Sequence, residues 1–233
     1  MQVDGFVRSD VSGPAPYVSS LVDQIPSGAL LVADFQAGQP VGASTSGSAS
    51  PLLAALGKVA GSLGGETAVY VSPGAPLPAV TLVTHPSDPQ ATLDALHEAL
   101  GALGSAVGGV KTGGFDLGAL LGALELSHAQ VGSELVVSTS QQAIDAFRGS
   151  GSKLTDDATF QEAQTASGMP ARTTGFVYVN LNDSLPALQG LLTLAGAGST
   201  TGSVDLSALR TLTAYGSGTS GGVTGFTAFL EVR

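Results

Sequence analysis

This chain of 233 residues contains no cysteine, and charged residues make up only 11% of it. Without cysteine, no disulfide bond holds the fold and no thiol can act as a nucleophile or a metal ligand. The redox compartment stays open, because a secreted protein can also lack cysteine. With 43% apolar residues the chain is too hydrophobic for intrinsic disorder, and it is long enough to bury a large core.

Basic residues are scarce as well. Eight Lys and Arg stand against eighteen Asp and Glu, which gives a net charge of −10. A nucleic-acid-binding protein needs a basic stripe to displace counterions, and this sequence has none. An anionic membrane surface would also repel the chain. We therefore expect no nucleic-acid partner.

The sequence lacks a run that could span a membrane. Its most apolar stretch, residues 101–126, is interrupted by Lys111, Asp116 and many glycines. The first residues, Met1-Gln2-Val3-Asp4, lack the basic flank and apolar run of a signal peptide. If the natural protein is exported or anchored, we expect its targeting segment to be missing from this sequence.

The spacing of apolar residues predicts a mixture of strands and helices. The clearest stretch, Thr173–Leu181, alternates its side chains and is rich in β-branched and aromatic residues, so it predicts a strand. Further strands are predicted at 3–9, 29–35 (a central strand), 66–72, 79–85, 125–131 and 134–138, with a last hairpin at 212–232. Helices are predicted at 17–25, 51–60, 87–103, 115–124, 155–165 and 183–195, and after a Ser138–Gln141 capping box.

A pattern in the first half of the chain recurs in the second half. Pro26 precedes the strand at 29–35, and Pro170, 144 residues later, precedes the strand at Phe176. Ala68-Val69-Tyr70 matches Thr213-Ala214-Tyr215 at an offset of 145 residues. Several elements in one order at nearly one offset predict a duplicated unit. We expect pseudo-repeats at about 17–85 and 158–232, joined by a connector at 86–157.

These patterns predict an α+β fold for one globular unit over residues 1–233. Hairpins join the strands within each unit, so the sheet or sheets should be largely antiparallel, with helices on one face. The two pseudo-repeats would share one sheet or stack two.

Residues 134–181 carry a resemblance to a known family, in segments 135–140, 143–147, 154–157 with Phe160, and 175–181. They resemble an uncharacterised domain family of bacterial, mainly actinobacterial, secreted or membrane-anchored proteins. The first half, from Ile25 to Leu100, fits the same family more loosely. The resemblance implies an extracytoplasmic location in the cell envelope, and it supplies no catalytic residues.

Two glycine-rich motif matches overlap near the C-terminus. Gly216–Gly221 fits the dinucleotide fingerprint, which requires a helix after it. Ser220 lies in a G-x-S-x-G match, which requires a helix behind the serine and a later histidine as base. A strand is predicted to follow, and no histidine does, so we interpret the segment as a hairpin turn.

Metal-binding patterns are missing too. His85, His97 and His128 have no metal-ligand spacing on one element. Asp156 and Asp157 could form an acid pair or a calcium site, but the glycine-centred calcium loop is absent and helix-start chemistry explains them. We expect neither a metal nor another cofactor.

Two groups of residues are candidates for ligand binding. Tyr70, Tyr178 and Tyr215 lie on predicted strands; aromatic strand residues usually pack in the core, but a line of them could floor a groove. A second group lies between glycine-rich segments and could form a movable lid: Leu117, Leu120, Leu121 and Leu124.

Two classes of function follow from these observations. The first is a non-enzymatic envelope domain that binds or spaces other components, with an unknown protein partner. The second is a carrier of an apolar small molecule or lipid, because helices rich in Leu, Ala and Gly over a sheet can leave an apolar pocket. A serine hydrolase using Ser220 is a third, less supported alternative.

Overall fold

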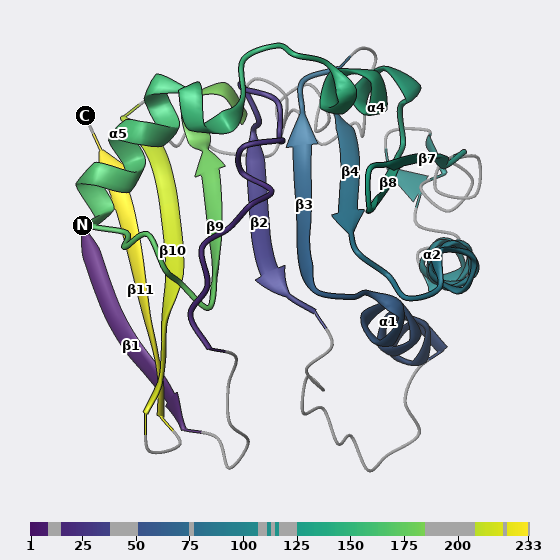
Figure 1. The fold of residues 1–233 in the computed structure, drawn as a ribbon, viewed down its shortest axis with the longest axis horizontal. Helices are drawn as coiled ribbons and strands as arrows, with labels where there is room; N and C mark the ends of the chain where they lie inside the picture. The colour runs from purple at the N-terminus through teal and green to yellow at the C-terminus, as the bar shows by residue number, and fades with distance from the viewer. Residues whose placement is uncertain are drawn as a thin grey trace.

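The computed structural model describes residues 1–8, 15–37, 51–74, 77–106, 111–112, 115–116, 125–184, 208–220 and 223–232. Nine strands form one sheet in the order β1-β11-β10-β9-β2-β3-β4-β8-β7 (Figure 1), and every neighbouring pair is antiparallel. Helices pack on this sheet, so the predicted α+β class and largely antiparallel sheet are confirmed.

The strands of the sheet are β1 (Gln2–Arg8), β2 (Leu31–Gln36), β3 (Glu66–Ser72), β4 (Ala79–Thr84), β7 (Ser127–Val131), β8 (Glu134–Ser138), β9 (Gly175–Asn180), β10 (Leu209–Ser220) and β11 (Val223–Val232). The helices are α1 (Pro51–Ser62), α2 (Pro89–Ala106), α4 (Gln141–Arg148), the 3₁₀ turn η1 (Leu154–Asp156) and α5 (Ala158–Ser167). Two short strands, β5 (Lys111–Thr112) and β6 (Phe115–Asp116), pair separately.

The centre of the sheet joins the two halves of the chain. β2 pairs with β9, and the register places Ala33 opposite Val177. The predicted central strand at 29–35 is therefore confirmed, although it begins two residues later, at Leu31. The predicted hairpins β3–β4 and β10–β11 extend the sheet outward from this pair on opposite sides.

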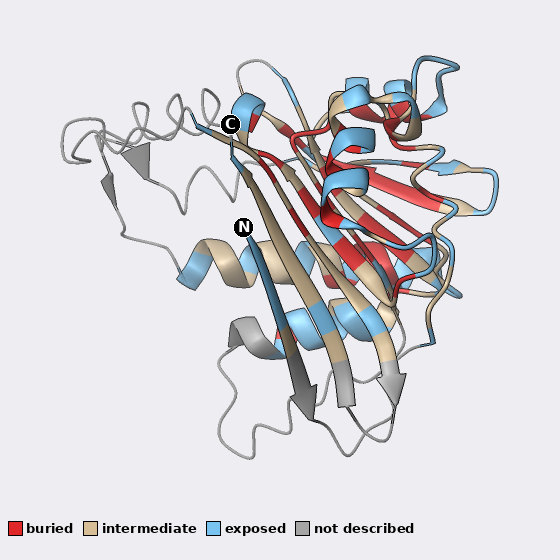
Figure 2. Cartoon of the chain, turned by 90° about the vertical axis from the view of Figure 1, so that its left-hand side faces the viewer, coloured by how far each residue is buried: buried red, intermediate tan, exposed pale blue. Residues whose placement is uncertain are grey.

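One face of the sheet, the covered face, carries Val32, Tyr70 and Tyr178 and lies under α4, α5 and the segment 17–25. Figure 2 shows the buried strand segments gathered under the helices on this side. Phe160 of α5 contacts the Tyr178 ring edge-on, with the ring centroids 5.0 Å apart. The main core consists of the side chains on this face together with those that the helices and loops bring to it: Leu21, Ile25, Ala29, Val32, Ala68, Tyr70, Val83, Ala129, Val136, Ile144, Phe147, Leu154, Phe160, Ala163, Phe176 and Tyr178.

The other face is called the open face, because apolar side chains such as Val80 and Val177 are exposed on it. Leu135 and Val137 of β8 alternate with Val136, so they point away from the covered face. They form a second, smaller cluster with Leu93 of α2. The expectation of helices on one face thus holds for α4 and α5, whereas α2 packs on the opposite face at the β8 edge.

The starts of two helices form as their sequences predict. The Asp88 carboxylate accepts the Ala91 N–H at 3.0 Å just ahead of α2. The Asp157 carboxylate accepts the N–H groups of Thr159 and Phe160 at the start of α5. Each carboxylate satisfies amides that have no partner within the helix, and its charge suits the positive end of the helix dipole.

Three local predictions need correction. Residues 17–25 do not form a helix: after a bridge from Tyr17 to Thr173 they contain only a turn at Leu21–Gln24, because their polar groups bond to the sheet instead. The Ser138–Gln141 capping box is absent, since Ser140 occupies the N-cap and the Ser138 hydroxyl pairs with Thr81.

The third correction concerns the helix predicted at 115–124. Residues 115 and 116 form strand β6, and residues 117–124 lie outside the described part of the chain. For the helix predicted at 183–195, residues 181–184 are helical and the remainder again lies outside the described residues.

A glycine at the start of β9 is required by the central pairing. Gly175 has φ +145°, and a Cβ there would lie 2.8 Å from the Asp34 carbonyl oxygen on β2. We expect Gly175→Ala to lower the free energy of unfolding by about 1–3 kcal/mol, because it adds both backbone strain and a clash. Urea denaturation measures this change.

Gly57→Ala is the matched control. Gly57 lies within α1, and a Cβ there would meet nothing within 4 Å. This substitution should raise the free energy of unfolding by up to about 1 kcal/mol, because Ala favours the helix. Equal effects of the two substitutions would contradict the steric argument.

Candidate functional site

A cavity of about 740 Å³ lies at one end of the sheet, where β2 and β4 begin and β3 and β9 end. Loop residues before β2, the β3–β4 loop and the first two turns of α4 complete its wall. The residues that line it are Pro26, Ser27, Leu30, Leu31, Val71, Ser72, Pro73, Gly74, Leu77, Pro78, Ala79, Val80, Thr139, Ser140, Gln142, Ala143, Ala146, Val179 and Ser184.

The wall of this cavity is largely apolar, and the lining residues that the structure describes include no Asp, Glu, Lys, Arg or His. Strand side chains such as Leu31 and Val179 form one side, and Ala143 and Ala146 of α4 form another. Hydroxyl and amide groups are dispersed between them. Apolar pockets of about 300–1,000 Å³ with a few polar groups are typical of small-molecule sites.

Tight local contacts shape the rim of the cavity. Pro26 bridges to Lys153, and the Ser27 N–H donates to the Ser152 carbonyl oxygen at 3.0 Å. In the β3–β4 loop, a Cβ on Gly74 would lie 2.6 Å from the Leu77 carbonyl oxygen, so this position accepts only glycine without a backbone shift. The rim is therefore held by backbone contacts on both sides.

The three predicted tyrosines lie on the covered face and do not line the cavity. Tyr70 and Tyr178 are fully buried in the main core, and burial raises the pKa of Tyr70 to about 12. Tyr215 is half-buried beside this core, and its hydroxyl donates to the Ser167 carbonyl oxygen at 3.1 Å. Leu117, Leu120, Leu121 and Leu124 lie outside the described residues.

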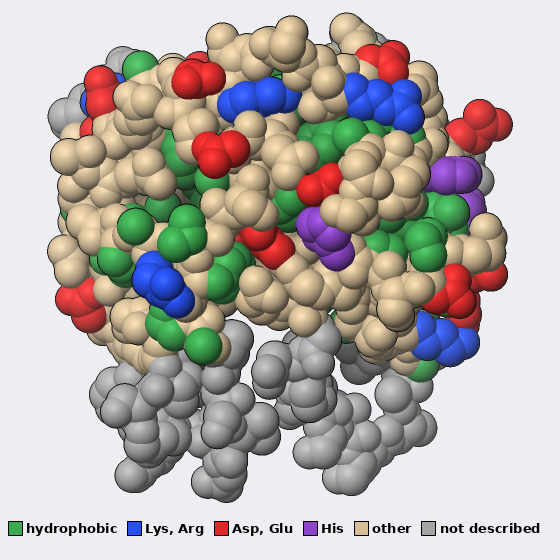
Figure 3. Space-filling model, in the orientation of Figure 1, with side chains coloured by type: hydrophobic (Ala, Val, Ile, Leu, Met, Phe, Trp, Pro, Cys, Tyr) green, Lys and Arg blue, Asp and Glu red, His purple; other side chains and the backbone are tan. Residues whose placement is uncertain are grey.

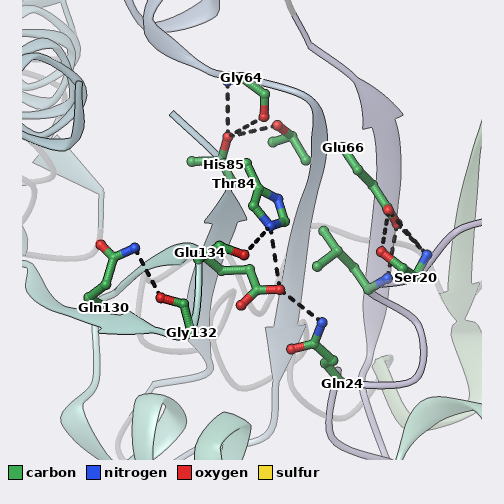
Figure 4. A network of polar contacts seen from close by, with 12 residues as sticks. Ser20, Gln24, Gly64, Glu66, Thr84, His85, Gln130, Gly132 and Glu134 are labelled. Atoms are coloured by element: carbon green, nitrogen blue, oxygen red, sulfur yellow. Dashed lines mark hydrogen bonds and ion pairs between the residues drawn. The ribbon is translucent and has the colours of Figure 1, made fainter. Parts of the chain in front are cut away.

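A carboxylate network fastens residues 17–21 onto the covered face. The buried Asp34 accepts hydrogen bonds from the Tyr17 hydroxyl and from the Ser19 hydroxyl, the latter at 3.0 Å. Glu66, on the neighbouring strand, accepts from the hydroxyl and N–H of Ser20 and from the Leu21 N–H (Figure 4). These bonds replace the intrahelical bonds that a helix at 17–25 would have made.

The two carboxylates share one hydroxyl. Ser19 Oγ lies 3.0 Å from Asp34 Oδ2 and 2.7 Å from Glu66 Oε1, but it has a single proton to donate. Burial raises the pKa of Asp34 to about 7, helped by the neighbouring charge of Glu66. Although burial opposes it, hydrogen bonding from Ser20 and Ser19 lowers the pKa of Glu66. The network therefore favours a neutral Asp34 beside an ionised Glu66.

A serine, a histidine and a glutamate also meet at the β7–β8 turn (Figure 4). His85 Nε2 lies 3.0 Å from Ser133 Oγ and 3.5 Å from Glu134 Oε1. In a catalytic triad the acid contacts the other ring nitrogen, so that the histidine is oriented toward the serine. Here both groups contact one nitrogen, and this arrangement does not activate Ser133 as a triad would.

The glycine-rich motif near the C-terminus forms a hairpin. Ser220 ends β10 and pairs with Val223 of β11, so a strand follows the motif and no helix does. The predicted hairpin interpretation is confirmed for residues 216–220, and Gly221 lies outside the described residues. Neither a dinucleotide site nor a nucleophile elbow has the structural context it requires there.

Sequence reasoning raised the possibility of an apolar pocket but named none of the residues that line this cavity, and it missed the carboxylate network. Asp34 carried a usable signal, because a single acid within the apolar run 29–35 of a central strand must find partners when buried. The cavity had no comparable signal, since its wall is assembled from segments spread between Pro26 and Ser184.

On the face drawn in Figure 3, the charged side chains of the described residues do not gather into a second candidate site. Acidic and basic side chains are dispersed over the face drawn in Figure 3. Within the described ranges, no group of three or more His, Asp or Glu residues could hold a metal ion. The search for membrane-spanning helices, limited to the same residues, found none of sufficient length and hydrophobicity.

Comparison with protein-family models, with curated proteins and with solved structures found no match for this chain. The resemblance to an envelope family therefore stays a prediction, and any functional argument depends on the geometry of the chain itself.

The Asp34 network should make stability depend on pH. A carboxyl group with a raised pKa in the folded state contributes its full stabilisation below its unfolded pKa of about 4, and this is lost as the pH rises toward 7. The difference in unfolding free energy between the native chain and Asp34→Asn should therefore fall by roughly 2–4 kcal/mol from pH 4 to pH 7, as measured by urea denaturation.

Glu66→Gln is the control, because the stabilisation by Glu66 should depend on pH in the opposite direction to that by Asp34. Because the pKa of Glu66 is lowered, its stabilisation is present above about pH 4.5 and is lost as the pH falls below that value. If the difference between the native chain and Asp34→Asn were instead flat between pH 4 and pH 7, Asp34 would not be held in its neutral form.

Proposed function

We propose that this chain is a non-enzymatic binding domain that takes an uncharged, largely apolar small molecule into the cavity at the end of its sheet. The observation that carries the proposal is a cavity of about 740 Å³ to whose wall the described residues contribute no charged side chain. A charged group moved into such a wall would lose its hydration without gaining an ionic partner. In contrast, burial of apolar ligand surface contributes a favourable free energy of about 25 cal/mol per Å².

A few polar side chains are available to orient the ligand. Thr139 and Ser184 are already engaged, since Thr139 Oγ accepts the Val80 N–H at 3.0 Å and Ser184 Oγ donates to the Asn180 carbonyl oxygen at 2.5 Å. In the described part of the chain, no hydrogen bond engages the side chains of Ser72, Ser140 and Gln142. These three groups would recognise a hydroxyl or carbonyl group on an otherwise apolar molecule.

The binding proposal is tested with the neutral fluorophore N-phenyl-1-naphthylamine. Ala146 is an exposed residue of α4 on the cavity wall, so Ala146→Phe should fill the cavity without disturbing the core. We expect this variant to bind the fluorophore about tenfold more weakly or worse, a loss of about 1.4 kcal/mol. Fluorescence titration measures the affinity.

Ala166→Phe is the control, because Ala166 is an exposed helical alanine on α5 that does not line the cavity. Its affinity should equal that of the native chain. No fluorescence enhancement with the native chain, or equal affinities for both phenylalanine variants, would reject the proposal.

The proposed cellular location of this domain rests on the sequence alone. The resemblance to an envelope family is the reason to propose an extracytoplasmic domain, and nothing in the geometry bears on it. The serine hydrolase alternative is less supported, because Ser220 lies in a β-hairpin. Turnover of esterase substrates that disappears in Ser220→Ala would favour this alternative over simple binding.

We also infer that the sheet arose by duplication. The strand order from β1 to β8 has a symmetry about the β9–β2 pair. If β1 is exchanged with β8, β2 with β9, β3 with β10 and β4 with β11, the same order results, read from the opposite end. Val32 of β2 and Tyr70 of β3 are cross-strand partners. Adding the sequence offsets of 144 and 145 to their numbers gives Phe176 and Tyr215, which are also cross-strand partners. In this arrangement the first strand of each unit pairs with the last strand of the other, as β1 with β11 and β8 with β4.

This inference places the start of the second unit at β8, inside the segment 86–157 that the sequence analysis assigned to a connector. An experimental structure in which β9, β10 and β11 did not superpose on β2, β3 and β4 with these registers would reject the duplication.

A further inference from the structure

The open face continues from the cavity without a polar interruption. Four residues of the cavity wall, Leu31, Val71, Val80 and Val179, are direct cross-strand neighbours on this face. Two residues further along each strand lies a second apolar row, formed by Val177, Ala33, Val69 and Leu82. The cavity wall is thus the first row of a longer apolar surface.

Side chains on this surface are accessible in part. Val80 in the first row is 45% exposed and Val177 in the second row is 38% exposed. Phe35, which follows Ala33 on β2, is 36% exposed. Strand geometry places Phe35 about 14 Å from Leu31, so the surface extends well beyond the cavity.

The acidic residues of the same strands lie on the opposite face. Asp34 alternates with Ala33 on β2, and Glu66 lies on the same side of β3 as Ala68 and Tyr70. The two rows therefore contain no charge and no hydroxyl group. Such a surface interacts favourably with hydrocarbon, and it offers nothing to a polar or charged molecule.

We propose that the ligand is a neutral amphiphile with one long alkyl chain, which runs from the cavity onto the open face past Val177 to Phe35. This proposal rests on the proposed function and names the chemical class of its ligand. The polar end would lie near the hydroxyl and amide groups that Ser72, Ser140 and Gln142 bring to the wall. A compact apolar molecule would fill the cavity and leave the second row unused.

A chain-length series tests the extended path on the full chain. Octanol, decanol, dodecanol and tetradecanol are added separately to displace N-phenyl-1-naphthylamine. Each buried methylene should tighten binding about fourfold, which corresponds to about 0.8 kcal/mol. We expect this gain to persist through tetradecanol, because the second row continues to offer apolar contacts.

Val177→Asp separates the second row from the cavity. Val177 does not line the cavity, so octanol should bind as it does to the native chain, whereas tetradecanol should bind at least about tenfold more weakly. Val3→Asp is the control: Val3 is 53% exposed in the same row but lies on the edge strand β1, three strands away from β9. Val177→Thr, which keeps the side-chain shape, gives the same readout if the aspartate variant does not fold.

The outcomes distinguish the two proposals. In one outcome, octanol displaces the fluorophore and Ala146→Phe weakens fluorophore binding, but the affinity for alcohols stops rising beyond octanol. If Val177→Asp and Val3→Asp then also bind tetradecanol equally well, the ligand is compact and the extended path is wrong. If no alcohol displaces the fluorophore and Ala146→Phe has no effect, the binding function itself fails. A continuous rise with chain length that Val177→Asp alone abolishes supports both proposals.

Discussion

The pairing of β2 with β9 is the contact on which the rest of the structure depends. It joins strands from the two halves of the chain. On its other edge β2 pairs with the hairpin β3–β4, and β9 pairs with the hairpin β10–β11. The pair also sets which residues face which layer. A shift of one residue would turn Asp34 toward the open face and Ala33 toward the core. Gly175, where the Asp34 carbonyl oxygen comes close, fixes this register at one end.

The two faces of the sheet have different chemistry because of that register. The covered face combines large aromatic side chains with buried carboxyl and hydroxyl groups, and each acid is held by hydrogen bonds from the segment 17–21. The open face carries aliphatic side chains and almost no polar atoms in its central rows. The cavity lies at the strand ends, where the apolar rows of the open face meet the loops. Its wall therefore combines apolar side chains from this face with hydroxyl groups from the loops.

The strands and most helices could be predicted from sequence because their signals are local. Side-chain alternation marked the strands, and Asp88 and Asp157 marked two helix starts through bonds to amides only a few residues away. Residues 17–25 misled the prediction because Leu21 and Ile25 have helical spacing. Their neighbours bond to Glu66, more than forty residues away, and no local pattern encodes such a partner. The cavity is a property of the assembled loops, and for that reason the sequence could suggest an apolar pocket but could not place its wall.

The position of β1 has a consequence for how the chain reaches this structure. β1 precedes the other strands of this sheet in the sequence, but it pairs with β11, which follows them, and Gln2 lies opposite Phe229. During synthesis, β1 must therefore wait for this partner until β11 has emerged from the ribosome. Contacts between such distant segments slow folding, and an unpaired strand can associate with other chains in the meantime. Pairing of β1 with β11 is thus expected to be a late step in the folding of this sheet.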